Sequence, residues 1–266
     1  MESKYNLLTP RSKELNLCDT EAVRQYFKIN KIDFIIHSAS VGGIRGVSDT
    51  DSVVKKNLSM VYNLLNFKNS SCRVILFGSG AMYDRKRNLI RVEEREIGNF
   101  IPSEPYGKSK LDIYELVKSR NDVLCLNIFG CYGYYELETR FPEYAIKCAL
   151  CGKDIEITND ALFDYVWIED LNRIVLHFIL NCPKYGVINV TPDTSLYLHE
   201  IANEVVKISG KKLSIKVINK KTGYEYTGSN FLLRSELKDF VFTPLSVGLS
   251  KLYRHNEKIY KQLIRR

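Results

Sequence analysis

A tyrosine and a lysine four residues apart give the sequence its clearest chemical signal. Tyr106 and Lys110 bound the segment YGKSK, which directly follows Pro105. Proline is favoured at the first position of a helix, and residues i and i+4 share one helix face, so the ammonium is expected near the phenol. A nearby cation favours the ionised form of a phenol, which suits proton transfer. The spacing alone also fits an ordinary surface helix.

Small and polar residues follow two apolar runs upstream of this pair. Ser79 stands just after the run at 74–77, and Ala39 and Ser40 stand in SASVGG after the run at 33–36. Open α/β sheets bind their ligands at the carboxyl ends of the strands. We therefore expect Ser79 to hydrogen-bond the oxygen that Tyr106 protonates, and the small residues to admit a flat cofactor close to the backbone.

The elements that would position these residues alternate between strands and helices. Apolar runs at 6–9, 33–37, 73–77 and 123–128 predict buried parallel strands, and amphipathic segments at 20–30, 50–67 and 105–120 predict helices. This alternation predicts an α/β fold with a Rossmann-like, doubly wound parallel sheet. After about residue 140 we expect short strands at 155–157, 187–190 and 214–217 among helices at 140–151, 169–181, 197–208 and 246–263. We expect most of these elements to form a smaller C-terminal α/β lobe.

Charge and composition restrict the class of partner. The 266 residues carry a net charge of +8, but residues 251–266 hold six basic residues and one acid and so account for +5. The rest of the chain is nearly balanced, which argues against a nucleic-acid groove and suits an anionic substrate. We expect no membrane span, no signal peptide and a cytoplasmic location with reduced thiols. Cys148 and Cys151 form a CxxC that we interpret as buried free thiols, and we expect no metal site.

The motifs, taken in order, resemble those of the extended short-chain dehydrogenases/reductases acting on nucleotide sugars. This is the NAD-dependent epimerase/dehydratase family, and the GDP-fucose synthase-like branch is the most similar. The matching segments are ELNLCD (14–19), IHSASVGGI (36–44), FGSGAMY (77–83), EPYGKSK (104–110), FGCYG (129–133), VWIEDLNR (166–173) and GVINV (186–190).

The resemblance implies NAD(P)-dependent reduction or epimerisation of a 4-keto sugar. It implies Ser79, Tyr106 and Lys110 as catalytic residues. The implied cofactor-binding residues are Arg11, Asp19, Ala39, Ser40, Asn57, Tyr106, Lys110 and Ile128, and the substrate-binding residues are Ala81, Met82, Gly130 and Arg140. Arg11 and Lys13 lie where NAD-preferring members carry an acid, so NADP is expected and NAD remains open. A homodimer is also implied.

Several positions depart from the family pattern. The cysteine of the epimerases falls at Ala81 and their histidine near Arg140 or Phe141, which favours simple reduction. Phe163 stands where the family has an arginine that often binds a diphosphate. Arg140 either replaces that charge or is a surface residue.

The sequence also lacks the GxxGxxG strand–helix unit that holds a pyrophosphate. We therefore expect an incomplete dinucleotide-binding domain at 1–139, to which 166–190 return, and a mostly substrate-binding lobe at 140–266. Two hypotheses stay open: a nucleotide-sugar oxidoreductase, and a non-catalytic relative that binds a sugar nucleotide or a partner subunit.

Overall fold

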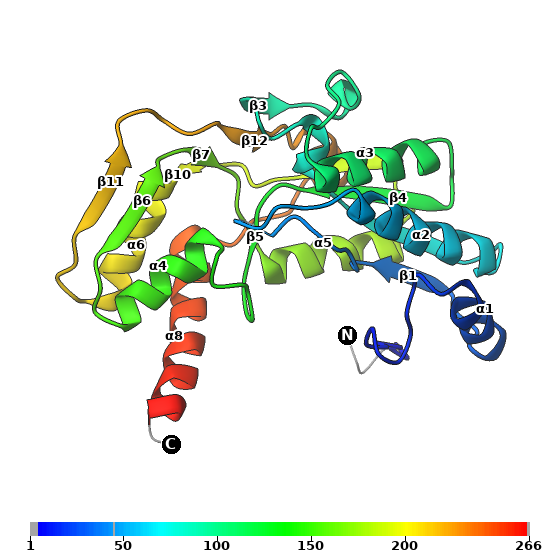
Figure 1. Ribbon diagram of the computed structural model, residues 1–266, viewed down its shortest axis with the longest axis horizontal. Coiled ribbons are helices and arrows are strands. Elements are labelled where there is room, and N and C mark those ends of the chain that lie inside the picture. Colours follow the sequence, from blue (N-terminus) through cyan, green and yellow to red (C-terminus); the bar gives the residue numbers. More distant parts are fainter. Residues whose placement is uncertain (1–4, 45, 265–266) are drawn as a thin grey trace.

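The computed structural model describes residues 5–44 and 46–264, and Figure 1 shows them as two parts that each contain helices and strands. The central sheet has four parallel strands in the order β1-β2-β4-β9. Their bounds are β1 Phe34–His37, β2 Arg73–Ser79, β4 Val123–Ile128 and β9 Val187–Val190. The predicted α/β fold with a parallel sheet is confirmed.

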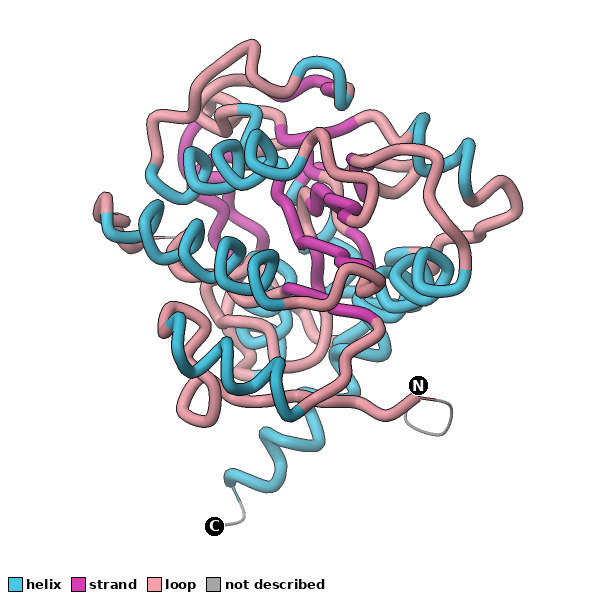
Figure 2. The backbone as a smooth tube through the Cα atoms, turned by 90° about the vertical axis from the view of Figure 1, so that its right-hand side faces the viewer, coloured by secondary structure: helices cyan, strands magenta, loops and turns pink. Residues whose placement is uncertain are grey.

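Helices cover both faces of this sheet, as alternate side chains of β2 show. Val74 and Leu76 pack on α2 (Ser52–Phe67) and α3 (Pro105–Val117). Ile75, on the opposite face, packs on α5 (Ile168–Leu180) and α7 (Phe231–Glu236). Successive residues of a strand point to opposite faces, so an unbroken apolar run is what a strand buried on both sides requires. Helix α1 (Thr20–Ile29) contacts α2, and Figure 2 shows the helices of this end side by side.

The second part of the molecule has its own apolar core. It is built from α4 (Phe141–Leu150), β6 (Ile155–Asn159), α6 (Leu198–Ser209), β11 (Ile215–Asn219) and α8 (Leu245–Ile264). Ile146, Ile201 and Leu252 are completely buried where α4, α6 and α8 meet. Their spacing on amphipathic helices explains why the sequence pattern located these elements.

A small mixed sheet joins the two parts, in the order β10-β7-β12-β3. Its strands are β3 (Leu89–Val92), β7 (Leu162–Phe163), β10 (Leu196–Tyr197) and β12 (Tyr226–Gly228). Two further strands, β5 (Cys131–Tyr132) and β8 (Val166–Trp167), pair with each other. Two short 3₁₀ turns, η1 (Gly80–Tyr83) and η2 (Glu94–Glu96), follow β2 and β3. Because β12 pairs with β3, a late segment of the chain lies next to residues that follow β2.

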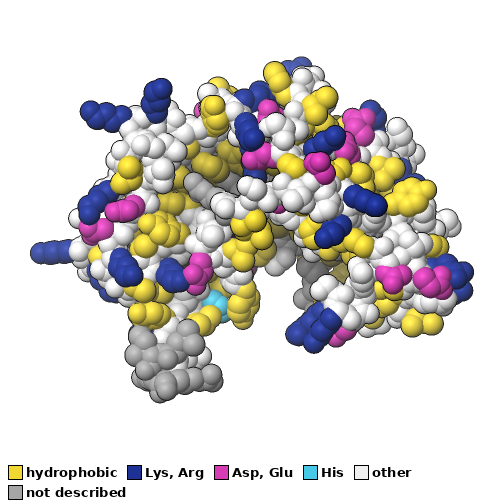
Figure 3. Space-filling model, viewed as in Figure 1, with side chains coloured by type: hydrophobic (Ala, Val, Ile, Leu, Met, Phe, Trp, Pro, Cys, Tyr) yellow, Lys and Arg dark blue, Asp and Glu magenta, His cyan; other side chains and the backbone are white. Residues whose placement is uncertain are grey.

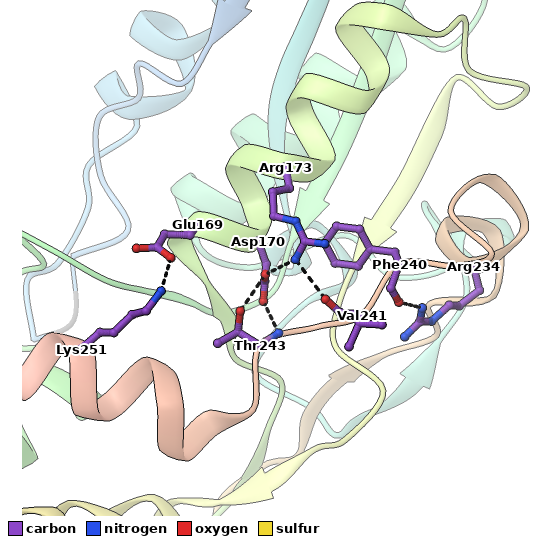
Figure 4. Close-up of polar contacts among 8 residues, drawn as sticks. All are labelled: Glu169, Asp170, Arg173, Arg234, Phe240, Val241, Thr243 and Lys251. Atoms are coloured by element: carbon purple, nitrogen blue, oxygen red, sulfur yellow. Dashed lines mark hydrogen bonds and ion pairs between the residues drawn. The ribbon is translucent and has the colours of Figure 1, made fainter.

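A buried carboxylate attaches the C-terminal helix to α5 (Figure 4). Asp170 accepts hydrogen bonds from the backbone N–H of Thr243 at 2.7 Å and from its hydroxyl at 2.9 Å. Arg173 donates both to Asp170 and to the carbonyl of Val241, at 3.1 Å each. Lys251 of α8 pairs with Glu169 at 2.6 Å. These contacts fix the segment that leads from the sheet into α8.

The expected strand at 6–9 is wrong. Residues 6–10 are irregular, and Leu7 and Leu8 are each more than two-fifths exposed. Within the described residues, β1 pairs only with β2 and forms an edge of the sheet. A β-strand is stabilised by hydrogen bonds to a neighbouring strand, so an apolar run that lacks such a neighbour does not form a strand.

Cysteine and surface charge complete the description. All seven cysteines are free thiols, and Cys148 and Cys151 are half-buried rather than buried.

Figure 3 shows lysine and arginine side chains spread over the face of the molecule that it draws, with acidic side chains among them. Among the described helices, none has the length together with the apolar character that crossing a membrane requires.

Candidate active site

The first two turns of α3 hold Tyr106 and Lys110 in the predicted relation. The Nζ atom of Lys110 lies 5.5 Å from the centroid of the Tyr106 ring and donates to the carbonyl oxygen of Phe77 at 2.8 Å. Lys110 is buried and Tyr106 is half-buried. Just before Pro105, Glu104 forms an ion pair with Arg85, which holds the start of the helix. The lysine is thus anchored to β2 while its charge stays close to the phenol.

Ser79 ends β2 and caps the turn that follows it. Its hydroxyl accepts a hydrogen bond from the N–H of Ala81 at 3.2 Å. Helix α3 comes very close to this turn, because a Cβ atom at Gly107 would lie only 2.6 Å from the carbonyl oxygen of Ala81. The glycine directly after Tyr106 therefore allows the helix and the serine turn to meet.

Asn57 connects three segments around Tyr106. Its side-chain amide donates to the carbonyl of Val41 at 3.0 Å and accepts from the N–H of Val41 at 2.9 Å. The same amide donates to Ser109 at 2.9 Å, and the Ser109 hydroxyl donates to the carbonyl of Tyr106 at 2.7 Å. Asn57 is almost completely buried. In this structure it positions the loop after β1 against α3.

A histidine lies next to the buried lysine. His37, the last residue of β1, is buried, and burial together with the nearby Lys110 charge lowers the pKa of its imidazole to about 4. The ring is therefore neutral near pH 7. His37 therefore adds no positive charge beside Lys110 near pH 7.

The structure adds Tyr226, which sequence reasoning missed. Its side chain extends from β12 to the turn after β2, where a Cβ atom at Gly80 would lie only 2.6 Å from its hydroxyl, and Ser79 and Tyr106 both act on its pKa. The ring packs against Phe129 and Phe163, at centroid distances of 5.2 and 5.6 Å. Burial raises the pKa of the Tyr226 hydroxyl, so it stays protonated. Nothing in the segment YEYTGSN marks Tyr226 as a site residue, because only the β12–β3 pairing brings it there.

The predicted cofactor residues lie at several places. Ala39 and Ser40 are exposed on the loop after β1, and Ile128 is half-buried at the end of β4, in register with Ser79. Arg11 is exposed, and Asp19 is exposed while it caps α1 through the N–H groups of Glu21 and Ala22. Their contact with a cofactor remains a prediction.

The residues present fit one half of a dinucleotide. An exposed loop of small residues, a half-buried tyrosine and an anchored lysine at the carboxyl edge of the sheet suit a nicotinamide and its ribose. The sequence offers no GxxGxxG for the pyrophosphate. Tyr106, Lys110 and the 38–40 loop are therefore the part of the site that supports a cofactor.

The predicted substrate residues differ in their accessibility. Ala81 and Met82 are buried within η1, so their placement adds no support for contact with a substrate. Gly130 packs so closely that a Cβ atom there would lie 2.4 Å from the carbonyl oxygen of Asp164. Arg140 is exposed at the start of α4 and acts electrostatically on Glu136. Of the four, Arg140 alone presents an open charged side chain.

Comparison with known proteins agrees with this arrangement. The model of the NAD dependent epimerase/dehydratase family matches residues 2–191. The chain belongs to this family. It is also 28% identical over 232 residues to GDP-L-colitose synthase of Yersinia pseudotuberculosis, covering 78% of this chain and 75% of that protein.

Solved structures share the fold of this family member. One is a GDP-mannoheptose C4 reductase from Campylobacter jejuni with NADP bound, with a TM-score of 0.80 at 16% identity, covering 95% of this chain and 91% of that one. Another is the dTDP-4-dehydrorhamnose reductase of Bacillus anthracis in complex with NADP, with a TM-score of 0.78 at 17% identity, covering 96% and 90%. The predicted family and fold class are confirmed, whereas the roles of individual site residues remain predictions.

Proposed function

We propose that this family member is an NADP-dependent reductase of a nucleotide-linked 4-keto sugar. The observation that carries the proposal is the position of Lys110, whose ammonium is fixed to the carbonyl of Phe77 and lies 5.5 Å from the Tyr106 ring. A nicotinamide cofactor, when bound, would supply the hydride. Tyr106 would give its hydroxyl proton to the keto oxygen, and Ser79 would orient that oxygen by a hydrogen bond.

The preference for reduction over epimerisation rests on the residues near the serine. Ala81 occupies the place of the proton-transferring cysteine, and a methyl group cannot move a proton between carbons. The preference for NADP rests on the exposed Arg11, which suits a 2′-phosphate, and on the NADP in the two similar reductases. A GDP sugar is proposed because the curated relative and one of these structures act on GDP sugars.

Binding and turnover test this function with the purified chain. NADPH is titrated by fluorescence, and its oxidation is followed at 340 nm with GDP- and dTDP-linked 4-keto-6-deoxyhexoses. We expect NADPH binding, turnover of at least one GDP sugar, and a fall of about 100-fold or more in kcat for Tyr106→Phe with NADPH binding retained. NADPH binding without turnover of any sugar would favour the non-catalytic hypothesis, and absence of NADPH binding would overturn the proposal.

We also propose that the molecule forms a homodimer through α2 and α3. Tyr62 of α2 and Leu116 of α3 are 57% and 41% exposed and line one depression of about 340 Å³. Large exposed apolar side chains that gather on one surface are typical of contact faces. Light scattering should give about twice the chain mass of 30.7 kDa, and Tyr62→Glu should return it to one chain. A wild-type chain that stays monomeric would contradict the proposal.

A further inference from the structure

The carboxylate of Asp49 lies against two consecutive glycines of the loop after β1. Its Oδ2 atom accepts a hydrogen bond from the N–H of Gly43 at 2.9 Å. A Cβ atom at Gly42 would lie only 2.8 Å from its Oδ1 atom. Asp49 is half-buried, and the Ser–Tyr–Lys arrangement gives this contact no role.

Gly43 is also the residue on which the ring of Tyr106 rests. A Cβ atom at Gly43 would lie 2.9 or 3.0 Å from three atoms of that ring, so the ring is in contact with the backbone itself. A shift of the Gly43 backbone would therefore move the surface that supports the phenol. Asp49 holds this backbone by its N–H group.

The two glycines make the segment dependent on a contact from outside it. Gly42 and Gly43 have φ angles of +83° and +73°, a region that glycine enters and leaves without the steric penalty of other residues. Their own conformational preferences therefore do not fix the loop. A carboxylate that accepts from a backbone N–H forms one of the stronger hydrogen bonds in proteins, so Asp49 supplies the restraint that the glycines lack.

A separate contact holds the preceding part of the same loop. Asn57 accepts from the N–H of Val41 at 2.9 Å and donates to its carbonyl at 3.0 Å. Residues 39–40, which are predicted to line the cofactor, come before Val41, and Gly43 comes after it. Removal of the Asp49 carboxylate should therefore release the glycines and leave the cofactor side of the loop in place.

We propose that Asp49 is a positioning residue, which holds the N–H of Gly43 and thereby keeps the ring of Tyr106 where its hydroxyl can reach the keto oxygen of the substrate. The inference rests on the proposed reductase function. In this role Asp49 acts through Gly43 and takes no part in the proton transfer itself.

Two substitutions of Asp49 test this role, because Asp49→Ala removes the acceptor whereas Asp49→Asn keeps an acceptor oxygen without the charge. In Asp49→Ala we expect kcat for the reduced sugar to fall about tenfold, the loss expected for one hydrogen bond. The Kd for NADPH should be unchanged, which also shows that the variant is folded. Asp49→Asn should keep most of the activity. Equal losses in the two variants, or full activity of Asp49→Ala, would overturn the inference.

Asp51→Ala is the matched control. Asp51 lies two residues away, is exposed and makes no side-chain hydrogen bond as the N-cap of α2. The kinetic constants of this variant should equal those of the wild type.

A double-mutant cycle separates positioning through Gly43 from a general structural effect. In the Gly43→Ala background, where the added methyl group already displaces the Tyr106 ring, Asp49→Ala should produce no further loss of kcat. Equal losses in both backgrounds would contradict the proposed route. Failure of the wild type to reduce any sugar would instead reject the proposed function, so the two failures are distinguishable.

A readout that needs no substrate completes the test. With ¹³Cζ-labelled tyrosine, the Tyr106 resonance is assigned by its disappearance in Tyr106→Phe. Asp49→Ala should shift this resonance by more than Asp49→Asn does, and Asp51→Ala should leave it in place. An unmoved Tyr106 resonance in Asp49→Ala would show that the carboxylate does not position the ring and would overturn the inference independently of activity.

Discussion

The ring of Tyr106 lies directly against the backbone of Gly43: a Cβ atom at Gly43 would come within 2.9 Å of it. Gly43 also has a φ of +73°, and its N–H donates to Asp49 at 2.9 Å. The loop after β1 thus forms one wall for the tyrosine.

Gly43→Ala should therefore displace the Tyr106 ring. We expect kcat to fall at least tenfold and stability to decrease by about 1–3 kcal/mol, from backbone strain and overpacking together. Gly46→Ala is the matched control, because Gly46 has a φ of +80° but nothing within 4 Å of an added Cβ. Steady-state kinetics and urea unfolding of both variants measure the difference, and equal activity losses would contradict the ring contact.

Lys110→Met should weaken NADPH binding and turnover, each about tenfold or more. Methionine fills a similar volume but leaves the carbonyl of Phe77 without its donor and removes the charge beside Tyr106. Lys108→Met, a change at an exposed position of the same helix, should leave both quantities unchanged. The measurements are NADPH titration and initial rates. A fully active Lys110→Met would exclude Lys110 from the catalytic residues.

Asn57→Ala should destabilise the protein by about 1–3 kcal/mol, because it removes the hydrogen bonds that this buried amide makes with the backbone of Val41 and with the Ser109 hydroxyl. Asn66→Ala changes an exposed residue of the same helix and should have an effect within about 0.5 kcal/mol. Urea unfolding curves give both values. If the two variants were equally stable, the bridge made by Asn57 would contribute nothing to the fold.

His37 should contribute to acid sensitivity. Its pKa is lowered to about 4 in the folded chain, so between about pH 6.5 and 4 the unfolded chain takes up a proton that the folded chain refuses. Stability is unaffected above this window and falls as the pH decreases through it, by at most about 3 kcal/mol. His37→Asn should lose less stability than the wild type between pH 7 and 4 in urea unfolding. His177→Gln, a change at a half-buried histidine of α5, should follow the wild type.

Much of this protein could be predicted from its sequence, because the signals involved are local. The apolar runs of β1, β2 and β4 and the i, i+4 spacing of Tyr106 and Lys110 depend on neighbouring residues alone, and the structure contains all of them. Motif order then determined the family. The same local reasoning failed at residues 6–9, where a strand also requires a partner strand.

Only the tertiary structure decided what surrounds the predicted residues. Asn57 meets Val41 and Ser109 because α2 and α3 cover the same face of the sheet. Tyr226 reaches the turn after β2 because β12 pairs with β3 across more than 130 residues of chain. Such contacts depend on how distant elements pack, so they cannot be predicted from a residue's type and its sequence neighbours.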